Sequence, residues 1–169
     1  MTTPRIYIAD LAAYNNGYLH GVWIDATDEL DEIYKHIRTM LSKSPTDNSE
    51  EWALHDYEYF GNVKLSEWEN LESVQKMACF IEEHGDLAIE LIQHFDNIDE
   101  AITALSEHYV GEFTSLAEYA ENTILDTSEI PEHLKHYIDY SSMGCDWEMS
   151  GDIFTIETGF EEIHVFHNL

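Results

Sequence analysis

EFTSLAEYAENTILDTSEIPEHLKHYIDYSSMGCDWEMSGD, residues 112–152, combines ten carboxylates with a single cation, Lys135. Most neighbouring acids are three to seven residues apart, and apolar side chains such as Phe113, Tyr119 and Trp147 lie between them. A disordered acidic tail lacks the apolar residues that offset the entropy of ordering. The stretch therefore predicts a folded scaffold that holds carboxylates at fixed positions, as a surface for a basic partner.

The acidity extends through the whole chain but is uneven. The 169 residues contain 35 Asp and Glu against 7 Lys and Arg, a net charge of −28, and residues 77–169 hold 21 of these acids with one cation. Self-repulsion on this scale destabilises a compact fold, which indicates that another requirement maintains it. Because duplex DNA and membrane surfaces are also anionic, both are excluded as direct ligands. Solubility, salt adaptation and calcium binding compete with a basic protein partner as explanations.

The composition is that of a folded protein. With 44% hydrophobic and 12% aromatic residues the chain can bury a core, and its length suits one ordinary domain or two to three small ones. No apolar run approaches the roughly 18 residues of a membrane span, and no signal peptide is apparent. Cys79 and Cys145 are isolated, so we expect free thiols in a cytoplasmic protein.

Hydrophobic periodicity predicts strands at both ends of the chain and helices between them. Alternation predicts strands at residues 5–10, 18–25 and 51–59, and a terminal hairpin of residues 152–157 and 162–167. Helical spacing, with Trp68 on the apolar face of the second helix, predicts helices at residues 29–43, 67–84, 86–95, 98–108, 115–125 and 132–140, and a turn or short helix at 141–150.

Local signals mark the boundaries of these elements. Asn16-Gly17 suits a tight turn, and Thr27 or Asp28 suits the N-cap of the first helix. Ser66 with Glu69 has the pattern of a capping box, and glycine at position 85 suits a helix end. We therefore predict an α+β fold, arranged as an elongated chain of three small domains. These are an N-terminal α+β domain with an antiparallel sheet (1–61), a central helical bundle (62–104) and a C-terminal α+β domain (105–169).

No catalytic, metal or cofactor pattern stands out. The chain has no Walker loop, GxGxxG, GxSxG, HExxH or EF-hand calcium loop. His164 and His167 fall on opposite faces of the predicted last strand, which is a poor arrangement for binding one metal ion. The sequence therefore argues against an enzyme, and we expect no cofactor.

The charge has the magnitude of a DNA segment. Duplex DNA carries about one negative charge per 1.7 Å, so a net −28 matches roughly 48 Å of duplex. A protein that grips phosphates with Lys and Arg gains the same counterion release from fixed carboxylates. Acids that follow a surface of duplex-like dimensions favour an elongated chain of small modules.

Four segments resemble the ArdA family of antirestriction proteins, which plasmids and conjugative transposons carry. The matching segments are IYIADLAAYNNGYLHGVWIDA (6–26), EEWALHDYE (50–58), YVGEFTSLAEYAENTI (109–124) and IPEHLKHYIDYSSMGCDWEMSGDIFTIE (130–157). They occur in order over most of the chain, which makes the match specific. Residues 66–99 resemble the family in spacing and acidity more than in distinctive words.

This resemblance implies a DNA mimic, without catalysis, that inhibits type I restriction-modification enzymes. Such proteins occupy the DNA-binding groove of the methyltransferase core, formed by the specificity and modification subunits, and dimerise through the C-terminal part. Three small domains in a row, α+β, helical and α+β, are also implied. Residues 118–139 match the family's antirestriction region, where Lys135, His133 and His136 slightly dilute the charge.

We expect the acidic surface to draw on the carboxylates of the helical middle and the C-terminal third: Glu82, Glu83, Asp86, Glu90, Asp96, Asp99, Glu100, Glu107, Glu112, Glu118, Glu121, Asp126, Glu129, Glu132, Asp139, Asp146, Glu148 and Asp152. Tyr109, Val110 and Phe113 are candidates for the interface of a homodimer, or equally for the core at a domain junction. An acidic decoy or chaperone for another basic DNA-binding protein is the alternative function.

Overall fold

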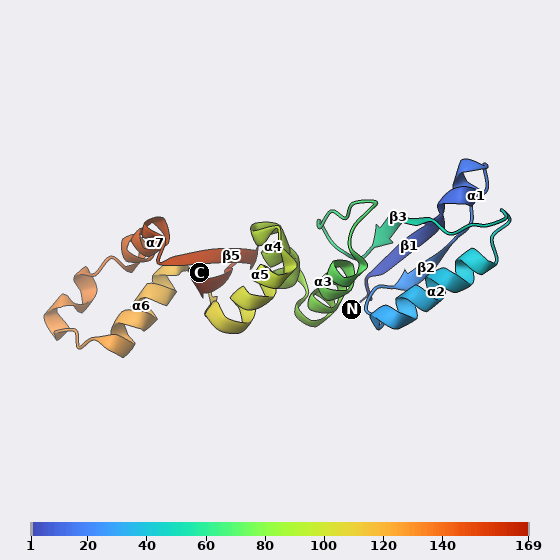
Figure 1. The fold of residues 1–169 in the computed structure, drawn as a ribbon. Coiled ribbons are helices and arrows are strands. Elements are labelled where there is room, and N and C mark those ends of the chain that lie inside the picture. Colours follow the sequence, from blue (N-terminus) through green and yellow to red (C-terminus); the bar gives the residue numbers. More distant parts are fainter. Residues whose placement is uncertain (1, 169) are drawn as a thin grey trace. The chain divides into compact units, whose positions relative to one another are not determined.

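The computed structural model describes residues 2–168, and contacts divide the chain into two compact units, Met1–Ile98 and Asp99–Leu169 (Figure 1). Each unit combines helices with a three-stranded antiparallel sheet, which confirms the α+β class. The finer division into three domains remains a prediction.

The sheet of the first unit is built around its first strand. β1 (Arg5–Asp10) lies between β2 (Gly21–Asp25) and β3 (Trp52–Glu58) and pairs antiparallel with both. Ile6 and Ile8 are fully buried because alternate residues of a strand point to the same face. β2 is three residues shorter at its start than predicted.

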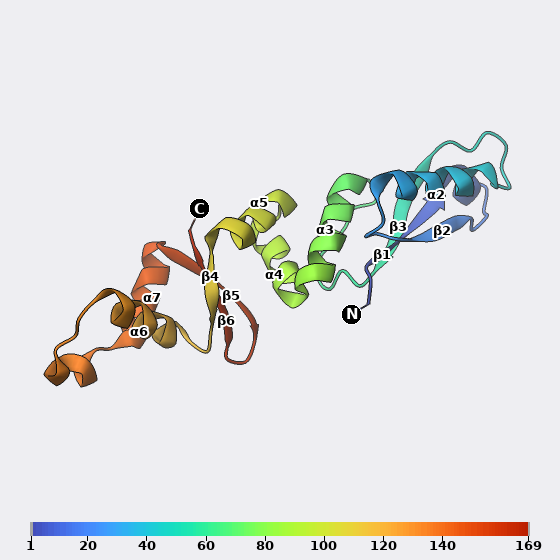
Figure 2. The ribbon, with the colours of Figure 1, turned by 90° about the horizontal axis from the view of Figure 1, so that it is seen from below.

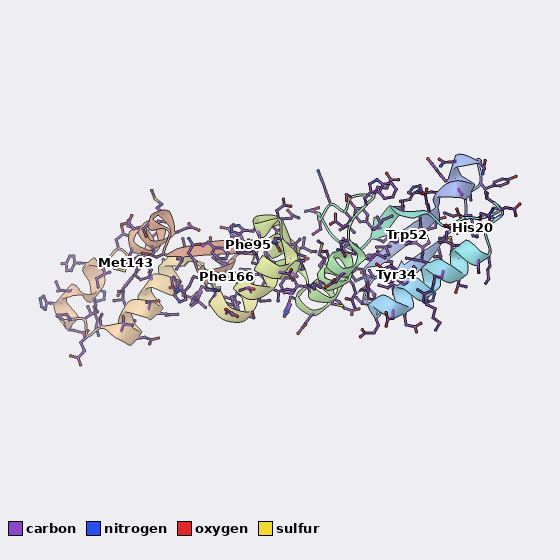
Figure 3. All side chains as sticks on the ribbon, in the orientation of Figure 1. His20, Tyr34, Trp52, Phe95, Met143 and Phe166 are labelled. Atoms are coloured by element: carbon purple, nitrogen blue, oxygen red, sulfur yellow. The ribbon has the colours of Figure 1, made fainter. Side chains whose placement is uncertain are left out.

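α2 (Leu30–Ser42) packs on this sheet through Ile33, Ile37 and Met40, which repeat at helical spacing and are buried (Figure 2). At its edge the rings of Tyr34 and Trp52 meet edge-to-face, 6.5 Å between centroids (Figure 3). The predicted N-caps were wrong, because Glu29 takes the cap position and makes no side-chain capping bond.

A short helix that was not predicted, α1 (Leu11–Asn15), follows β1. Asp10 is fully buried and caps it by accepting a hydrogen bond from the backbone N–H of Ala13 at 3.0 Å. The Ser49 hydroxyl also donates to this carboxylate, so the loop before β3 is tied to the start of α1. Gly17, with φ of +84°, forms the predicted turn after the helix.

Two helices, α3 (Leu71–His84) and α4 (Asp86–Phe95), complete the first unit. Ser66 and Glu69 do bond to each other, but they close a turn, and Asn70 caps α3. Trp68 therefore lies before the helix and is 70% exposed, which corrects its predicted place on the apolar face.

The second unit contains a strand that was not predicted. α5 (Ile98–Thr103) passes into a π-helical turn, η1 (Ala104–His108), and β4 (Tyr109–Phe113) follows directly. β4 pairs with β6 (Glu162–His167), which pairs in turn with β5 (Ile153–Gly159) in the predicted terminal hairpin.

Helices cover one end of this second sheet. α6 (Leu116–Thr127) leads through a 3-10 turn, η2 (Glu132–Tyr137), into α7 (Tyr140–Ser150). The predicted helix at 132–140 is thus shorter and of the tighter type. The core between helices and sheet contains Tyr119, Ile153 and Val165, with Trp147 packed against it.

Candidate acidic interaction surface

None of the eighteen acids predicted for the surface is buried. Glu90, Glu118 and Glu148 are half-buried and the others are exposed. Asp10 is the one acid that is buried among residues 2–168, and it was not among the predicted site residues. The fold therefore presents these carboxylates to solvent.

The start of α6 holds Glu118 rigidly. Ser115 is the N-cap and accepts a hydrogen bond from the Glu118 N–H at 3.1 Å. In return the Glu118 carboxylate accepts from the N–H of Thr114 at 2.6 Å and from its hydroxyl at 2.8 Å. This reciprocal pattern is a capping box shifted by one residue. The Thr114 hydrogen bonds favour the ionised form and lower the pKa of Glu118 below its usual value.

Asp139 is fixed in the same way at the start of α7. Its carboxylate accepts from the Ser142 N–H at 3.0 Å and from the Ser142 hydroxyl at 2.8 Å. These bonds lower the pKa of Asp139. Glu118 and Asp139 thus mark the two ends of the predicted antirestriction region, and hydrogen bonds at the helix starts favour the ionised form of both.

Three further acids are held by short-range contacts. The Thr155 hydroxyl donates to Glu148, and the Ser150 hydroxyl donates to Asp152 at 2.9 Å. Glu132 pairs with Lys135, N to O 2.8 Å, so the lone cation of residues 77–169 is matched by its neighbour. The positive charge of Lys135 therefore lies beside the Glu132 carboxylate.

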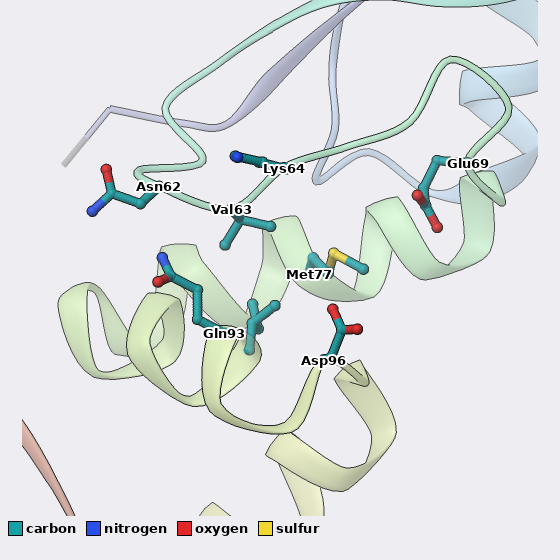
Figure 4. Close-up of a pocket in the computed structure, with 8 residues that line it drawn as sticks. Asn62, Val63, Lys64, Glu69, Met77, Gln93 and Asp96 are labelled. Carbon is teal, nitrogen blue, oxygen red and sulfur yellow. The ribbon is translucent and has the colours of Figure 1, made fainter.

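In the first unit, acids gather where α3 meets α4. Gly85, at φ of +58°, ends one helix and begins the next, so Glu82 and Asp86 lie on either side of the junction. The Thr3 hydroxyl donates to Glu82 Oε1 at 2.9 Å. At the other end of α4, Asp96 adopts a left-handed conformation and lines a cavity with Glu69, Lys64 and Met77 (Figure 4).

β4 is an edge strand, and two of the predicted interface residues are exposed on it. Tyr109 is 39% exposed and Val110 is 37% exposed. The register with β6 shifts between Tyr109 and Gly111, so Val110 is the extra residue of a bulge. Phe113 is half-buried and packs against Tyr119, with ring centroids 5.1 Å apart.

Comparison with known families identifies the chain. The family described as antirestriction protein (ArdA) matches residues 6–162, which is most of the chain. This chain belongs to the ArdA antirestriction family. None of the curated proteins compared with the chain matches it. Membership implies antirestriction activity and points to restriction-modification enzymes as targets.

The structure brings together only some of the residues predicted for this ArdA-family surface. Glu82 and Asp86 converge at one junction, and Glu118 and Asp139 cap two helices that pack together. The role of Tyr59 was missed. Its backbone has φ of +65° and it lines the same cavity as Glu82 and Asp86, but the sequence around it resembles an ordinary strand end.

A buried histidine was also missed as a structural feature. His164 is only 7% exposed, and its Nδ1 lies 2.9 Å from the Tyr109 hydroxyl. The Thr158 hydroxyl lies 3.1 Å from the other ring nitrogen, Nε2. Burial lowers the pKa of His164, which favours the neutral ring, and burial raises the pKa of Tyr109. The buried His164 side chain of β6 thus contacts Tyr109 of the exposed edge strand β4.

Metal-ligand clusters, cysteines and membrane-spanning helices are the remaining features sought in the sequence. Between residues 2 and 168 no group of three His, Cys, Asp or Glu is placed to hold a metal ion. Cys79 and Cys145 are free thiols, as expected, and burial raises the pKa of Cys79. No helix within this range is long and apolar enough to cross a membrane.

Proposed function

We propose that this ArdA-family chain is a DNA mimic that inhibits type I restriction-modification enzymes. It occupies the DNA-binding groove formed by the specificity and modification subunits, and fixed carboxylates take the place of phosphates. The observation that carries this proposal is the combination of family membership with the solvent accessibility of the eighteen predicted acids, of which fifteen are exposed and none is buried. The protein acts by binding alone, without catalysis or cofactor, in the cytoplasm of a cell that carries a plasmid or conjugative transposon.

Helix capping supports this mode of action. A phosphate backbone keeps its charge at every accessible pH and holds it at fixed spacing. Glu118 and Asp139 approach this behaviour because backbone N–H groups hold their carboxylates and lower their pKa. The proposed arrangement in three small domains would distribute such fixed charges along the groove.

The decisive measurement is binding of the purified chain to the methyltransferase core at several salt concentrations. We expect affinity to fall steeply with added salt, as for DNA, and target duplex to displace the protein. A complex that is indifferent to both salt and duplex would contradict mimicry. Restriction of unmodified phage in cells that express the chain gives the matching measurement in vivo.

The charge is spread over many weak contacts, so single changes are expected to matter little. Glu121→Gln, Asp126→Asn or Glu129→Gln alone should reduce affinity by less than about threefold, as for one exposed ion pair. Changing these three acids and Glu132 to lysine together should abolish measurable inhibition. Since none of the four caps a helix, thermal unfolding should confirm that the quadruple variant folds.

A second copy of the chain is the other proposed partner. The edge position of β4 leaves its outer N–H and C=O groups without a strand partner in this sheet, and Tyr109 and Val110 add exposed apolar surface there. A two-fold dimer through this edge would cover both features. Sedimentation should show a dimer, and Val110→Asp should shift it to monomer without unfolding it.

An acidic decoy for another basic DNA-binding protein remains the competing function. Capture from a lysate that lacks type I enzymes separates the two. Under our proposal the chain retains no abundant basic protein at physiological salt, whereas a decoy retains its target.

A further inference from the structure

A cavity of about 240 Å³ lies in the first unit between Tyr59 and the junction of α3 with α4. Its lining includes one tyrosine, two isoleucines and two acids: Tyr59, Ile81, Glu82, Asp86 and Ile89. The volume is below the roughly 300–1,000 Å³ of pockets that hold drug-sized ligands. It is therefore suited to a single side chain. We refer to this cavity as the Tyr59 socket.

Local geometry explains why these groups converge. Gly61 has φ of +58°, a conformation that favours glycine, and a Cβ there would lie 2.6 Å from the end of the Ile89 side chain, so this loop runs close to α4. Tyr59, two residues earlier, adopts φ of +65°, a conformation that bulky residues rarely take. The next residue, Phe60, is buried, whereas the Tyr59 ring remains 51% exposed. Tyr59 is therefore not a core residue.

The lining has the chemistry of a cation site with an aliphatic floor. Ile81 is buried and Ile89 is half-buried, so they offer apolar contact to a methylene stem. Glu82 and Asp86 supply two carboxylates, and the Thr3 hydroxyl orients the first of them. A tyrosine face attracts a guanidinium group, which can stack on it and bond to carboxylates at the same time.

We propose that the Tyr59 socket receives one arginine side chain from the protein partner of this chain. This inference rests on the proposed function, because it assumes that the partner presents a basic surface. Arginine fits better than lysine, since its planar group can stack on the ring while it donates to Glu82 and Asp86. The socket adds a discrete anchor to a surface whose remaining acids act collectively.

A neighbouring cavity provides an internal contrast. The cavity of Figure 4 is also lined by two acids, Glu69 and Asp96, and by apolar side chains such as Val63 and Met77. Its lining includes Lys64, whereas the lining of the Tyr59 socket, within residues 2–168, includes neither lysine nor arginine. A local cation repels a second one, so only the Tyr59 socket is expected to select arginine.

The first test needs no restriction enzyme. The full chain, with labelled isoleucine and methionine methyl groups, is titrated with N-acetyl-arginine-methylamide and separately with its neutral citrulline analogue. We expect saturable shifts at Ile81 and Ile89 with the arginine compound alone, at a dissociation constant on the order of millimolar. Met77 in the Figure 4 cavity should stay unchanged. No saturable shift with the arginine compound, or equal shifts with the citrulline analogue, would overturn the proposal.

The second test uses variants and the methyltransferase core. Tyr59→Leu removes the ring but keeps an apolar cover, and it should weaken binding roughly three- to thirty-fold, in line with a desolvated cation–π contact. Trp68→Leu is the matched control, because Trp68 is an exposed aromatic outside the socket lining, and it should change affinity less than about twofold.

The acids provide a second matched pair. Asp86→Asn should weaken binding more than Asp96→Asn, although both remove one exposed charge from α4 or its end. If Tyr59→Leu weakened binding no more than Trp68→Leu, and Asp86→Asn no more than Asp96→Asn, all in folded variants, the socket would be rejected. DNA mimicry would remain intact. Conversely, no binding of the wild-type chain to the enzyme would reject the proposed function, and the arginine titration would still decide the socket.

Discussion

Glu118 and Asp139 each combine two roles in one carboxylate. Asp139 is the N-cap of α7, and Glu118 accepts from the Thr114 N–H in the capping box of α6; both carboxylates also contribute to the acidic surface. The two roles reinforce each other, because the hydrogen bonds that stabilise the helix start also stabilise the ionised form. Such acids hold their charge at lower pH than acids that only face solvent.

The pH dependence of stability should reveal Glu118. Its pKa in the folded protein lies below the ordinary value of 4.5, so its ionisation stabilises the fold above about pH 4.5, and this contribution is lost as pH falls through the folded-state pKa. Glu118→Gln should therefore lower the melting temperature at pH 7, and the difference from wild type should shrink below pH 4.5.

Glu121→Gln is the control for this experiment, since Glu121 is exposed on the same helix and caps nothing. Removing its charge relieves repulsion and should not lower the melting temperature at pH 7. A Glu118→Gln difference that stays constant down to pH 3 would contradict the role given to ionisation.

Tyr109 links the exposed edge of β4 to the buried His164. Tyr109→Phe removes the hydrogen bond of 2.9 Å to Nδ1 but keeps the ring that packs on Phe166, with centroids 5.1 Å apart. We expect a loss of about 0.5–1.5 kcal/mol in the free energy of unfolding at pH 8, measured with urea. Tyr137→Phe, at an 85% exposed ring, is the control and should be neutral. Equal stability of Tyr109→Phe and the wild-type protein would show that water replaces the hydrogen bond between Tyr109 and His164.

At the scale of elements, the sequence predicted most clearly those with strong end signals. α4 has the predicted bounds because Gly85 and Asp96 both adopt positive φ at its ends. β4 was missed because its five residues include a glycine and a bulge, so apolar and polar residues do not alternate along it. A π-helical turn also precedes it directly. The capping box predicted at Ser66 and Glu69 was wrong, because the hydrogen bonds between these two residues form equally well in a turn.

The candidate site likewise contains features that the sequence could predict and features that it could not. Exposure of the acids could be predicted, since ionised carboxylates stay in water unless they are paired. The Tyr59 socket could not, because it depends on a positive φ at Tyr59 and on contact with a helix junction more than twenty residues later. No pattern local to either segment indicates that contact.

The packing of α6 against α7 makes a test at this scale. A Cβ on Gly144 would lie 2.6 Å from the Leu116 carbonyl oxygen and 2.9 Å from its Cβ, closer than real side chains approach. Gly144→Ala usually helps a helix by roughly 1 kcal/mol. Here we expect overpacking to dominate, with a net loss of about 1–3 kcal/mol in urea unfolding.

Ser141→Ala separates propensity from packing, because Ser141 is exposed in the same helix. It should be neutral or slightly stabilising, within about 0.5 kcal/mol. A Gly144→Ala variant more stable than wild type would show that α6 and α7 separate easily, and the carboxylates they carry would then not be rigidly placed.

For the whole molecule, electrostatic self-repulsion sets the balance between stability and function. Residues 99–169 carry sixteen acids and one cation, and Lys135 is already paired. Within residues 2–168 the opposing contacts are few and mostly exposed, such as Arg5 with Asp25 at 3.2 Å and Lys76 with Glu72 at 3.5 Å. Exposed pairs of this kind contribute little. The hydrophobic cores must therefore hold the fold against its own charge.

Added salt should consequently stabilise the free protein while it weakens the complex. Screening at 0.1 M acts beyond about 10 Å, so repulsion between distant acids fades as salt rises. We expect the melting temperature to rise steadily from low salt to about 0.5 M sodium chloride. The triple variant Glu121→Gln, Asp126→Asn, Glu129→Gln should melt higher at low salt and gain less from added salt, because less repulsion remains to be screened. A melting temperature that falls with salt would mean that attractive pairs outweigh repulsion. The surface would then be organised by ion pairing, and a protein stabilised in that way would be a poor imitation of a phosphate backbone.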